Sequence, residues 1–199
     1  MISGREIKCV VVGDPVVGKT RMLYSFTLGI FPEHIPTVLD WPDFTHRLTV
    51  DGIPVTLEIF DMTGLDTYDR LRPLTYAVKP PVEVVIMCFS IVSPLSFDRV
   101  TSKWYPEMKQ YCKRAPIILV GTKMDLREDA EAIQILSQCG QKPLEVEQGK
   151  VLADSIKAVK YFECSALLHS GTTQIFEEAV RTVLRNDGEK HPKRKCVII

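Results

Sequence analysis

The stretch that most constrains the fold is residues 13–20, Gly-Asp-Pro-Val-Val-Gly-Lys-Thr, directly after the apolar run Cys9–Val12. It fits the pattern G-x-x-x-x-G-K-[ST], in which a strand ends, a loop follows and a helix begins. Backbone N–H groups in such a loop point at an anion, with the positive helix end behind them. An accidental match at a strand-to-helix turn is the alternative. We expect nucleotide contacts from Gly13, Asp14, Val16, Val17, Gly18, Lys19, Thr20 and Arg21.

Two side chains of this loop have specific expected roles. Lys19 would reach the β- and γ-phosphates, and the Thr20 hydroxyl would sit on Mg²⁺. The sequence therefore predicts a site for a metal-bound nucleoside phosphate.

Apolar runs of strand length alternate with helix-length periodic stretches along the chain. This predicts an α/β fold of the P-loop NTPase type, three layers with a mainly parallel six-stranded sheet and helices on both faces. Asp51-Gly52 is a hairpin turn between residues 44–50 and 53–60, so one antiparallel edge strand is expected. The other strands are expected at 7–13, 82–90, 117–121 and 161–164, and the helices at 18–28, 93–113, 145–159 and 172–184.

Composition suits one compact domain, because the chain has 199 residues of which 45% are hydrophobic. We assign residues 1–185 to this domain and residues 186–199 to a flexible basic tail. A polar insertion at about 128–142 contains a small apolar set, Ala132, Ile133 and Leu136; a partner-binding excursion and a tolerated loop both stay open for it. Basic and acidic residues number 25 each, so the formal net charge is zero and no nucleic-acid partner is expected.

The six cysteines show no C-x-x-C spacing, which favours reduced thiols and an intracellular protein. Arg5-Glu6 precedes any apolar stretch, and no apolar run approaches the ~18 residues that a membrane span requires. Any membrane contact should therefore come from a lipid or from charge.

A second phosphate-binding element follows the hairpin. Asp61-Met62-Thr63-Gly64 lies at the carboxyl end of a strand, where open α/β sheets bind their ligands. Asp61 would hold Mg²⁺ through a water molecule, and Gly64 offers an N–H to the γ-phosphate with no side chain in the way. Thr37 would add a hydroxyl ligand from residues 29–43, which three prolines exclude from regular structure and which we expect to be mobile.

The segment Thr122-Lys123-Met124-Asp125 addresses the choice of base. The Asp125 carboxylate can accept two hydrogen bonds from guanine N1 and N2, which adenine cannot supply. Lys123 can lay its aliphatic stem along the base, and Ser165-Ala166 can present an N–H to guanine O6. Thr122 and Leu167 complete the expected contacts. The combination favours GTP over ATP and argues against a P-loop kinase or ATPase.

In this order, the motifs resemble those of Ras-superfamily small GTPases, and the resemblance covers residues 5–199. Other segments are similar to the Rho family, nearest its Rac and Cdc-type members: residues 68–74, 89–90, 93–97 and the insertion. The resemblance implies a monomeric signalling protein that binds GTP or GDP with Mg²⁺ and regulates the cytoskeleton, polarity or membrane traffic. Its implied partners are effectors, exchange factors and a dissociation inhibitor.

The resemblance also assigns roles to segments. Phe31 should pack edge-on beside the guanine, residues 37–40 should belong to switch I, and residues 62–76 to switch II. Switch I departs from the family pattern, with one residue fewer before Thr37 and an altered effector stretch, so effector choice cannot be inherited from relatives. The expected effector contacts are Val38, Leu39, Asp40 and Trp41.

Three further departures concern hydrolysis. Rho proteins usually have Gly, Ala and Gln where this chain has Pro15, Thr63 and Leu65. That Gln orients the attacking water, and Leu65 has neither donor nor acceptor for the task. Pro15 lacks an N–H and adds a ring where an activator's arginine would enter. Slow hydrolysis is expected, although neutral drift and a water held by the Thr63 hydroxyl remain open.

Two hypotheses therefore stand. One is a GTP-loaded interaction module that hardly hydrolyses and is controlled by abundance, location or nucleotide exchange. The other is an ordinary cycling switch with residual hydrolysis. The residues that bind nucleotide support both, and only Pro15, Thr63 and Leu65 separate them.

The last four residues, Cys196-Val197-Ile198-Ile199, fit C-a-a-X, and the aliphatic final residue favours a geranylgeranyl group on Cys196. Four basic residues lie among the last ten, so residues 1–189 have a formal net charge of about −4. One lipid gives only marginal attachment, so the basic cluster would supply a second attraction to an anionic membrane. The expected location is the cytoplasmic face of the plasma membrane or of endomembranes; a solvated basic tail is the alternative.

Overall fold

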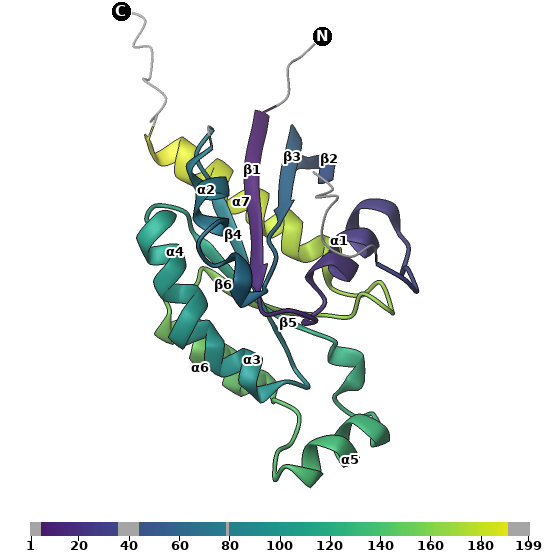
Figure 1. The fold of residues 1–199 in the computed structure, drawn as a ribbon. Helices are drawn as coiled ribbons and strands as arrows, with labels where there is room; N and C mark the ends of the chain where they lie inside the picture. The colour runs from purple at the N-terminus through teal and green to yellow at the C-terminus, as the bar shows by residue number, and fades with distance from the viewer. Residues whose placement is uncertain (1–4, 36–43, 79, 191–199) are drawn as a thin grey trace, which may run out of the picture.

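The computed structural model describes residues 5–35, 44–78 and 80–190, with side chains as far as Asp187. Its centre is a six-stranded sheet in the order β2-β3-β1-β4-β5-β6 (Figure 1). Only the β2–β3 pair is antiparallel, so the predicted mainly parallel sheet with one antiparallel edge strand is confirmed. The strands are β1 Arg5–Gly13, β2 Phe44–Val50, β3 Ile53–Asp61, β4 Val84–Ser90, β5 Ile117–Thr122 and β6 Lys160–Cys164.

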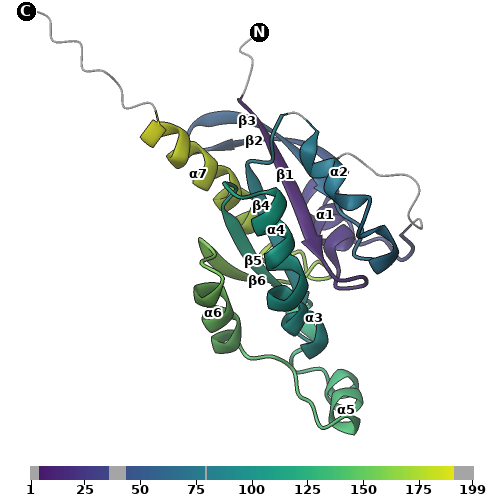
Figure 2. The same cartoon turned by 60° about the vertical axis from the view of Figure 1, so that its left-hand side comes forward.

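Helices cover both faces of the sheet (Figure 2). In β1, Ile7, Cys9 and Val11 face the core under α1 and α7, whereas Val10 and Val12 face the core under α2, α3, α4 and α6. This alternation follows from the two-residue period of a strand buried on both sides. The helices are α1 Lys19–Leu28, α2 Arg72–Ala77, α3 Pro94–Arg99, α4 Tyr105–Tyr111, α5 Ala130–Gln138, α6 Val146–Ser155 and α7 Thr172–Lys190.

The helix expected at 93–113 is divided. It begins as predicted, because the Ser93 hydroxyl accepts a hydrogen bond from the Ser96 N–H and Pro94 occupies the first turn. Residues 100–104 then form a π turn, in which the Tyr105 N–H donates to the carbonyl five residues earlier. Pro106 explains the interruption, since proline lacks an N–H and its ring clashes with a carbonyl four residues back in a regular helix.

The insertion differs from expectation in its small core. Helix α5 stands apart from the body of the protein (Figure 1), and of the three apolar residues expected to pack only Leu136 is buried. Ile133 is 41% exposed, because this short helix has only one neighbouring surface to pack on. Helix α7 also continues to Lys190, beyond the expected end at 184.

Two further observations concern the cysteines and the hydrophobicity of the helices. The cysteines of the described residues, Cys9, Cys88, Cys112, Cys139 and Cys164, all carry free thiols. In the part of the chain that is described, no helix is both long and apolar enough to cross a membrane.

Candidate nucleotide-binding site

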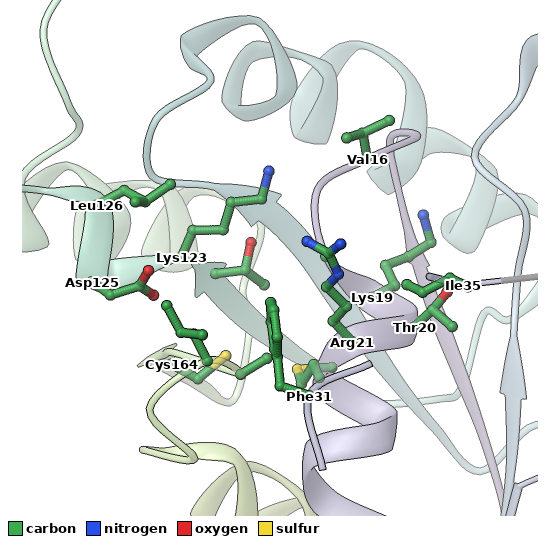
Figure 3. Close-up of a pocket in the computed structure, with 15 residues that line it drawn as sticks. Val16, Lys19, Thr20, Arg21, Phe31, Ile35, Lys123, Asp125, Leu126 and Cys164 are labelled. Carbon is green, nitrogen blue, oxygen red and sulfur yellow. The ribbon is translucent and has the colours of Figure 1, made fainter. Parts of the chain in front are cut away.

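The predicted motifs meet around one cavity of about 600 Å³ at the carboxyl ends of the central strands. This volume is of the size that small-molecule ligands occupy. Lys123 and Asp125 lie at one end of the cavity, Lys19 and Thr20 at the other, and Phe31 between them (Figure 3). The cavity is lined by Val16, Gly18, Lys19, Thr20, Arg21, Met22, Phe31, Ile35, Thr122, Lys123, Asp125, Leu126, Cys164, Ala166 and Leu167.

Most of the expected contact residues that the structure describes line this cavity. Asp61 bonds to the lining residue Thr20, and Gly64 packs on the loop that carries Gly13 and Asp14. The expected contacts that do not line the cavity are Gly13, Asp14, Val17, Asp61, Gly64 and Ser165. Sequence reasoning missed four lining residues, Met22, Ile35, Leu126 and Cys164, because apolar wall positions carry no chemical signal of their own. The expected roles of Thr37, Val38, Leu39, Asp40, Trp41 and Cys196 fall on residues outside those described.

The loop at residues 13–20 has a backbone that few side chains permit. Gly13 and Gly18 have φ values of 144° and 102°, and a Cβ on Gly13 would lie 2.2 Å from the Cys88 carbonyl oxygen. Val16 also has a positive φ, 61°, which is strained for a β-branched residue. The loop therefore holds a conformation set by its surroundings, in the way functional loops often do.

Lys19 lies under the loop. Its Nζ donates to the carbonyl oxygens of Gly13 at 2.8 Å and of Asp14 at 2.7 Å. Burial lowers the pKa of this ammonium, while the nearby Asp61 carboxylate acts in the opposite direction. A buried ammonium with part of its hydrogen-bonding capacity left over suits a polyphosphate ligand.

The side chains of Thr20 and Asp61 fit Mg²⁺. The Thr20 hydroxyl donates to Asp61 Oδ2, whereas Asp61 Oδ1 is buried and has no hydrogen-bond partner among the described residues. Burial raises the pKa of this carboxyl, against the opposing effects of Lys19 and Thr20. Because Mg²⁺ prefers oxygen ligands and usually keeps waters and phosphate oxygens as well, two oxygen-bearing side chains are a sufficient protein contribution.

At the other end, the base-binding segment has a strained start. Lys123 has φ 59°, and the preceding Thr122 hydroxyl bonds to the carbonyls of Val17 and Phe89, the latter at 2.9 Å. The Arg21 guanidinium lies over the Phe31 ring, 4.7 Å from its centroid. The Thr122–Val17 contact ties the segment to the P-loop, and Asp125 lines the cavity (Figure 3).

The loop after β6 closes on itself. Ser165 and Ser170 exchange two backbone hydrogen bonds of 2.9 Å, and the Ser165 hydroxyl accepts one from Leu168 N–H at 3.0 Å. His169 Nδ1 lies 2.9 Å from the hydroxyl of Ser25 in α1. Ala166 is therefore presented on a tight turn anchored at both ends.

The three residues that depart at the hydrolysis site come together. A Cβ on Gly64 would lie 2.4 Å from the backbone nitrogen of Pro15, so the segment after β3 packs directly on the P-loop. Thr63 and Leu65 flank this glycine; Leu65 is 38% exposed, and its N–H donates weakly to the Thr63 hydroxyl at 3.4 Å.

A cluster of charged side chains around Trp104, which the sequence did not predict, links the P-loop to the segment after Gly64. Trp104 Nε1 donates to Asp14 Oδ1 at 2.7 Å, and Arg99 Nε lies 3.3 Å from the same oxygen. Arg99 also reaches Asp66 at 2.5 Å, and Lys103 bridges Asp66 and Asp69 at 2.6 and 2.7 Å. We call these six residues the Trp104 cluster.

Arg72 extends the Trp104 cluster into the interior. Its fully buried guanidinium pairs with Glu107 at 2.8 Å, donates to the Thr63 carbonyl at 2.9 Å and lies 4.6 Å from the Trp104 ring centroid. The start of α2 is thus held against α4 by one arginine.

A family model described as the Ras family matches residues 8–185, which is most of the chain. The protein belongs to the Ras family. It is a GTP-binding small GTPase, a class whose members bind GTP or GDP with Mg²⁺ and interact with effectors, exchange factors and activators of hydrolysis.

Proposed function

We propose that this protein is a Rho-like small GTPase that stays GTP-bound because its hydrolysis is impaired, and that it engages effectors through switch I and switch II. The observation that carries this proposal is the packing of Gly64, the residue before Leu65, on the backbone of Pro15, a P-loop position that lacks an N–H. A hydrocarbon side chain cannot orient the attacking water, and the proline ring crowds the place where an activator's arginine enters.

An ordinary cycling switch with residual hydrolysis is the second candidate. The Thr63 hydroxyl favours it, since this group lies within 3.4 Å of the Leu65 nitrogen and is itself able to hold a water molecule. The assignment of bound nucleotide to Lys19, Thr20, Asp61 and Asp125 is common to both candidates, so the rate of hydrolysis alone separates them.

Single-turnover hydrolysis of bound GTP tests the proposal. The double variant Pro15→Gly with Leu65→Gln should hydrolyse GTP at least about tenfold faster than the natural protein, because a water-orienting amide is restored. Ile133→Gln is the matched control, an exposed apolar residue changed to the same amide in the insertion. If the natural protein already hydrolysed GTP as fast as the repaired variant, it would be a cycling switch.

Rho-like signalling also requires attachment to a membrane, and the sequence of the tail favours such attachment. Cys196 within C-a-a-X would carry a geranylgeranyl group, and Lys190, Lys193, Arg194 and Lys195 would bind an anionic leaflet at the plasma membrane or an endomembrane. Fractionation of cells tests this. Cys196→Ser should lose membrane association completely, and neutralising the last three basic residues should make it weaker and salt-sensitive. A Cys196→Ser protein that remained with membranes would show another anchor.

A further inference from the structure

We propose that Arg127 is a positioning residue for guanine recognition, acting through an ion pair with Glu163 that fixes the two base-binding loops relative to one another. The inference rests on the proposed assignment of the base to Asp125 and Ala166. Neither Arg127 nor Glu163 lines the cavity, so their effect on the base is indirect.

The pair is bidentate. Arg127 Nη1 and Nη2 lie 2.7 and 2.5 Å from the two carboxylate oxygens of Glu163. Parallel N–H···O bonds of this kind fix orientation as well as distance. The two side chains are 26% and 12% exposed, and Glu163 accepts a further hydrogen bond from the Tyr161 hydroxyl at 2.6 Å. The pair is therefore largely withdrawn from solvent, and both carboxylate oxygens of Glu163 are hydrogen-bonded.

Its place in the chain makes it a link between loops. Arg127 comes two residues after Asp125, and Glu163 two residues before Ser165. Strands β5 and β6 are neighbours, with Gly121 opposite Glu163, so the backbone sets the loops side by side up to the strand ends. Arg127 lies beyond the end of β5, whereas Glu163 is still in β6, so the ion pair ties the loop after β5 to the strand from which the Ser165-Ala166 loop leaves.

The segment that it holds requires external support. Lys123 has a left-handed backbone, φ 59°, which costs free energy in a residue other than glycine and persists only when neighbouring contacts impose it. Thr122 is fixed before this residue by its hydroxyl, which donates between the carbonyl oxygens of Val17 and Phe89, and Arg127 is fixed after it. Asp125 lies between the two anchors, so loss of the second anchor frees its carboxylate from one side.

The same guanidinium also fixes the chain where it rejoins the body of the protein after the insertion. Arg127 Nε donates to the Leu144 carbonyl at 3.0 Å, and the Leu144 N–H donates to the Ile91 carbonyl at 2.9 Å. Tyr161 is set in turn by Gly149 of α6, where a Cβ would lie 2.1 Å from the tyrosine ring. Arg127 therefore has a defined orientation from three sides.

The test compares dissociation of ribose-labelled fluorescent GDP and IDP. IDP lacks the exocyclic 2-amine, so the ratio of the two rates reports on the second hydrogen bond of Asp125. In Arg127→Gln and Glu163→Gln, GDP should dissociate about tenfold faster, the loss expected for one hydrogen bond to a charged group. The GDP-to-IDP rate ratio should move towards one. The double variant should be no faster than the faster single variant.

Two controls separate positioning from a general loss of structure. The factor by which EDTA accelerates GDP release should not change, because the metal end is untouched. Arg5→Gln should leave GDP release unchanged, although Arg5 also pairs with acidic side chains, Glu83 and Asp187, at the opposite end of β1. Equal acceleration of GDP and IDP, or no acceleration, would overturn the proposal.

Arg127→Lys keeps the positive charge but cannot form the bidentate pair, so it tests the proposal if the glutamine variants do not fold. It should release GDP faster than the natural protein and slower than a folded Arg127→Gln; natural kinetics in Arg127→Lys would also overturn the proposal. If the natural protein did not distinguish GDP from IDP at all, the assignment of Asp125 would fail instead, independently of Arg127.

Discussion

At the base end of the cavity, two loops leave adjacent strands, and the Arg127–Glu163 ion pair ties the first loop to the strand from which the second one leaves. At the phosphate end, by contrast, residues 66–72 continue well beyond β3 and are held by side chains reaching from α3, the π turn and α4. The carboxylate of Asp66 is 65% exposed there, so part of the support is open to solvent and salt.

The difference shows which part of the site is able to change state. Backbone pairing and a largely buried ion pair support the base end from within the protein. Residues 66–69, which precede the buried Arg72, depend instead on the exposed ion pairs of the Trp104 cluster, and such pairs contribute little individually. Regions with such weak local support are the ones from which moving segments are drawn. Removing supports at each end should therefore have different consequences.

The largest effect is expected for Arg72→Met. It leaves the Glu107 carboxylate, which is 12% exposed, with the Tyr76 hydroxyl but without its charged partner, and removing one partner of a buried pair costs ~3–5 kcal/mol of the free energy of unfolding. Urea denaturation measures it. A second variant, Arg72→Met with Glu107→Leu, should recover part of the loss. A destabilisation below ~1 kcal/mol for the single variant would mean that switch II is held mainly by its exposed contacts.

Asp125→Ala should act at the base end only. GTP binding should weaken by ~2 kcal/mol or more, because a charge-assisted contact is lost and the guanine edge is left poorly paired. Competition with a fluorescent guanine nucleotide provides the measurement. If unlabelled ATP displaced the probe from the natural protein as well as GTP does, the role of Asp125 in base choice would be refuted.

Trp104→Phe should have a smaller effect. The ring that lies under Arg72 is kept, but the Nε1 donor to Asp14 is lost, at ~1 kcal/mol of the free energy of unfolding. Guanine selectivity, measured as the GDP-to-IDP ratio, should not change. A change in that ratio would show that the two ends of the cavity are coupled and do not have independent supports.

The smallest effect concerns pH. Lys103, and then Arg99, hold the pKa of Asp66 below its ordinary value. Because the folded-state pKa is depressed, the contribution to stability is present above the ordinary carboxyl pKa of about 4 and is lost as pH falls through the lower value. Melting temperatures between pH 5 and 3 should show this component in the natural protein and not in Asp66→Asn, and high salt should reduce it. Identical profiles for the two proteins would exclude it.

The sequence predicts the sheet and the motifs because their signals are local. An apolar run such as residues 84–90 reads as a strand by itself, and Asp51-Gly52 reads as a hairpin turn, with φ values of 51° and 79° in the structure. The P-loop and the base-binding segment are likewise contiguous. Their convergence on one cavity follows from the parallel order of the strands.

What the sequence did not predict depends on partners distant in the chain. Asp14 and Trp104 are 90 residues apart, and Arg127 and Glu163 are 36 apart. Lys8 interrupts an apolar strand, and only the fold shows that its Nζ donates to the Val78 carbonyl at 2.7 Å, at the end of α2. The helical periodicity also predicted that Ile133 would be packed in a small core, whereas this side chain is exposed in the structure.

The π turn at residues 100–104 separates the helical phase of α3 from that of α4. Each residue of an α-helix turns the chain by about 100°, so a turn that takes up one more residue rotates everything after it by that amount. Ser96 in the first half stays bonded to the end of β4, at Ser90 N, while Trp104 and Glu107 are directed at the P-loop and switch II. If the same residues formed a regular α turn, α3 would stay seated but Trp104 and Glu107 would be rotated away from their partners, so the hydrogen-bond pattern of this turn specifies which surface the second half of the helix contacts.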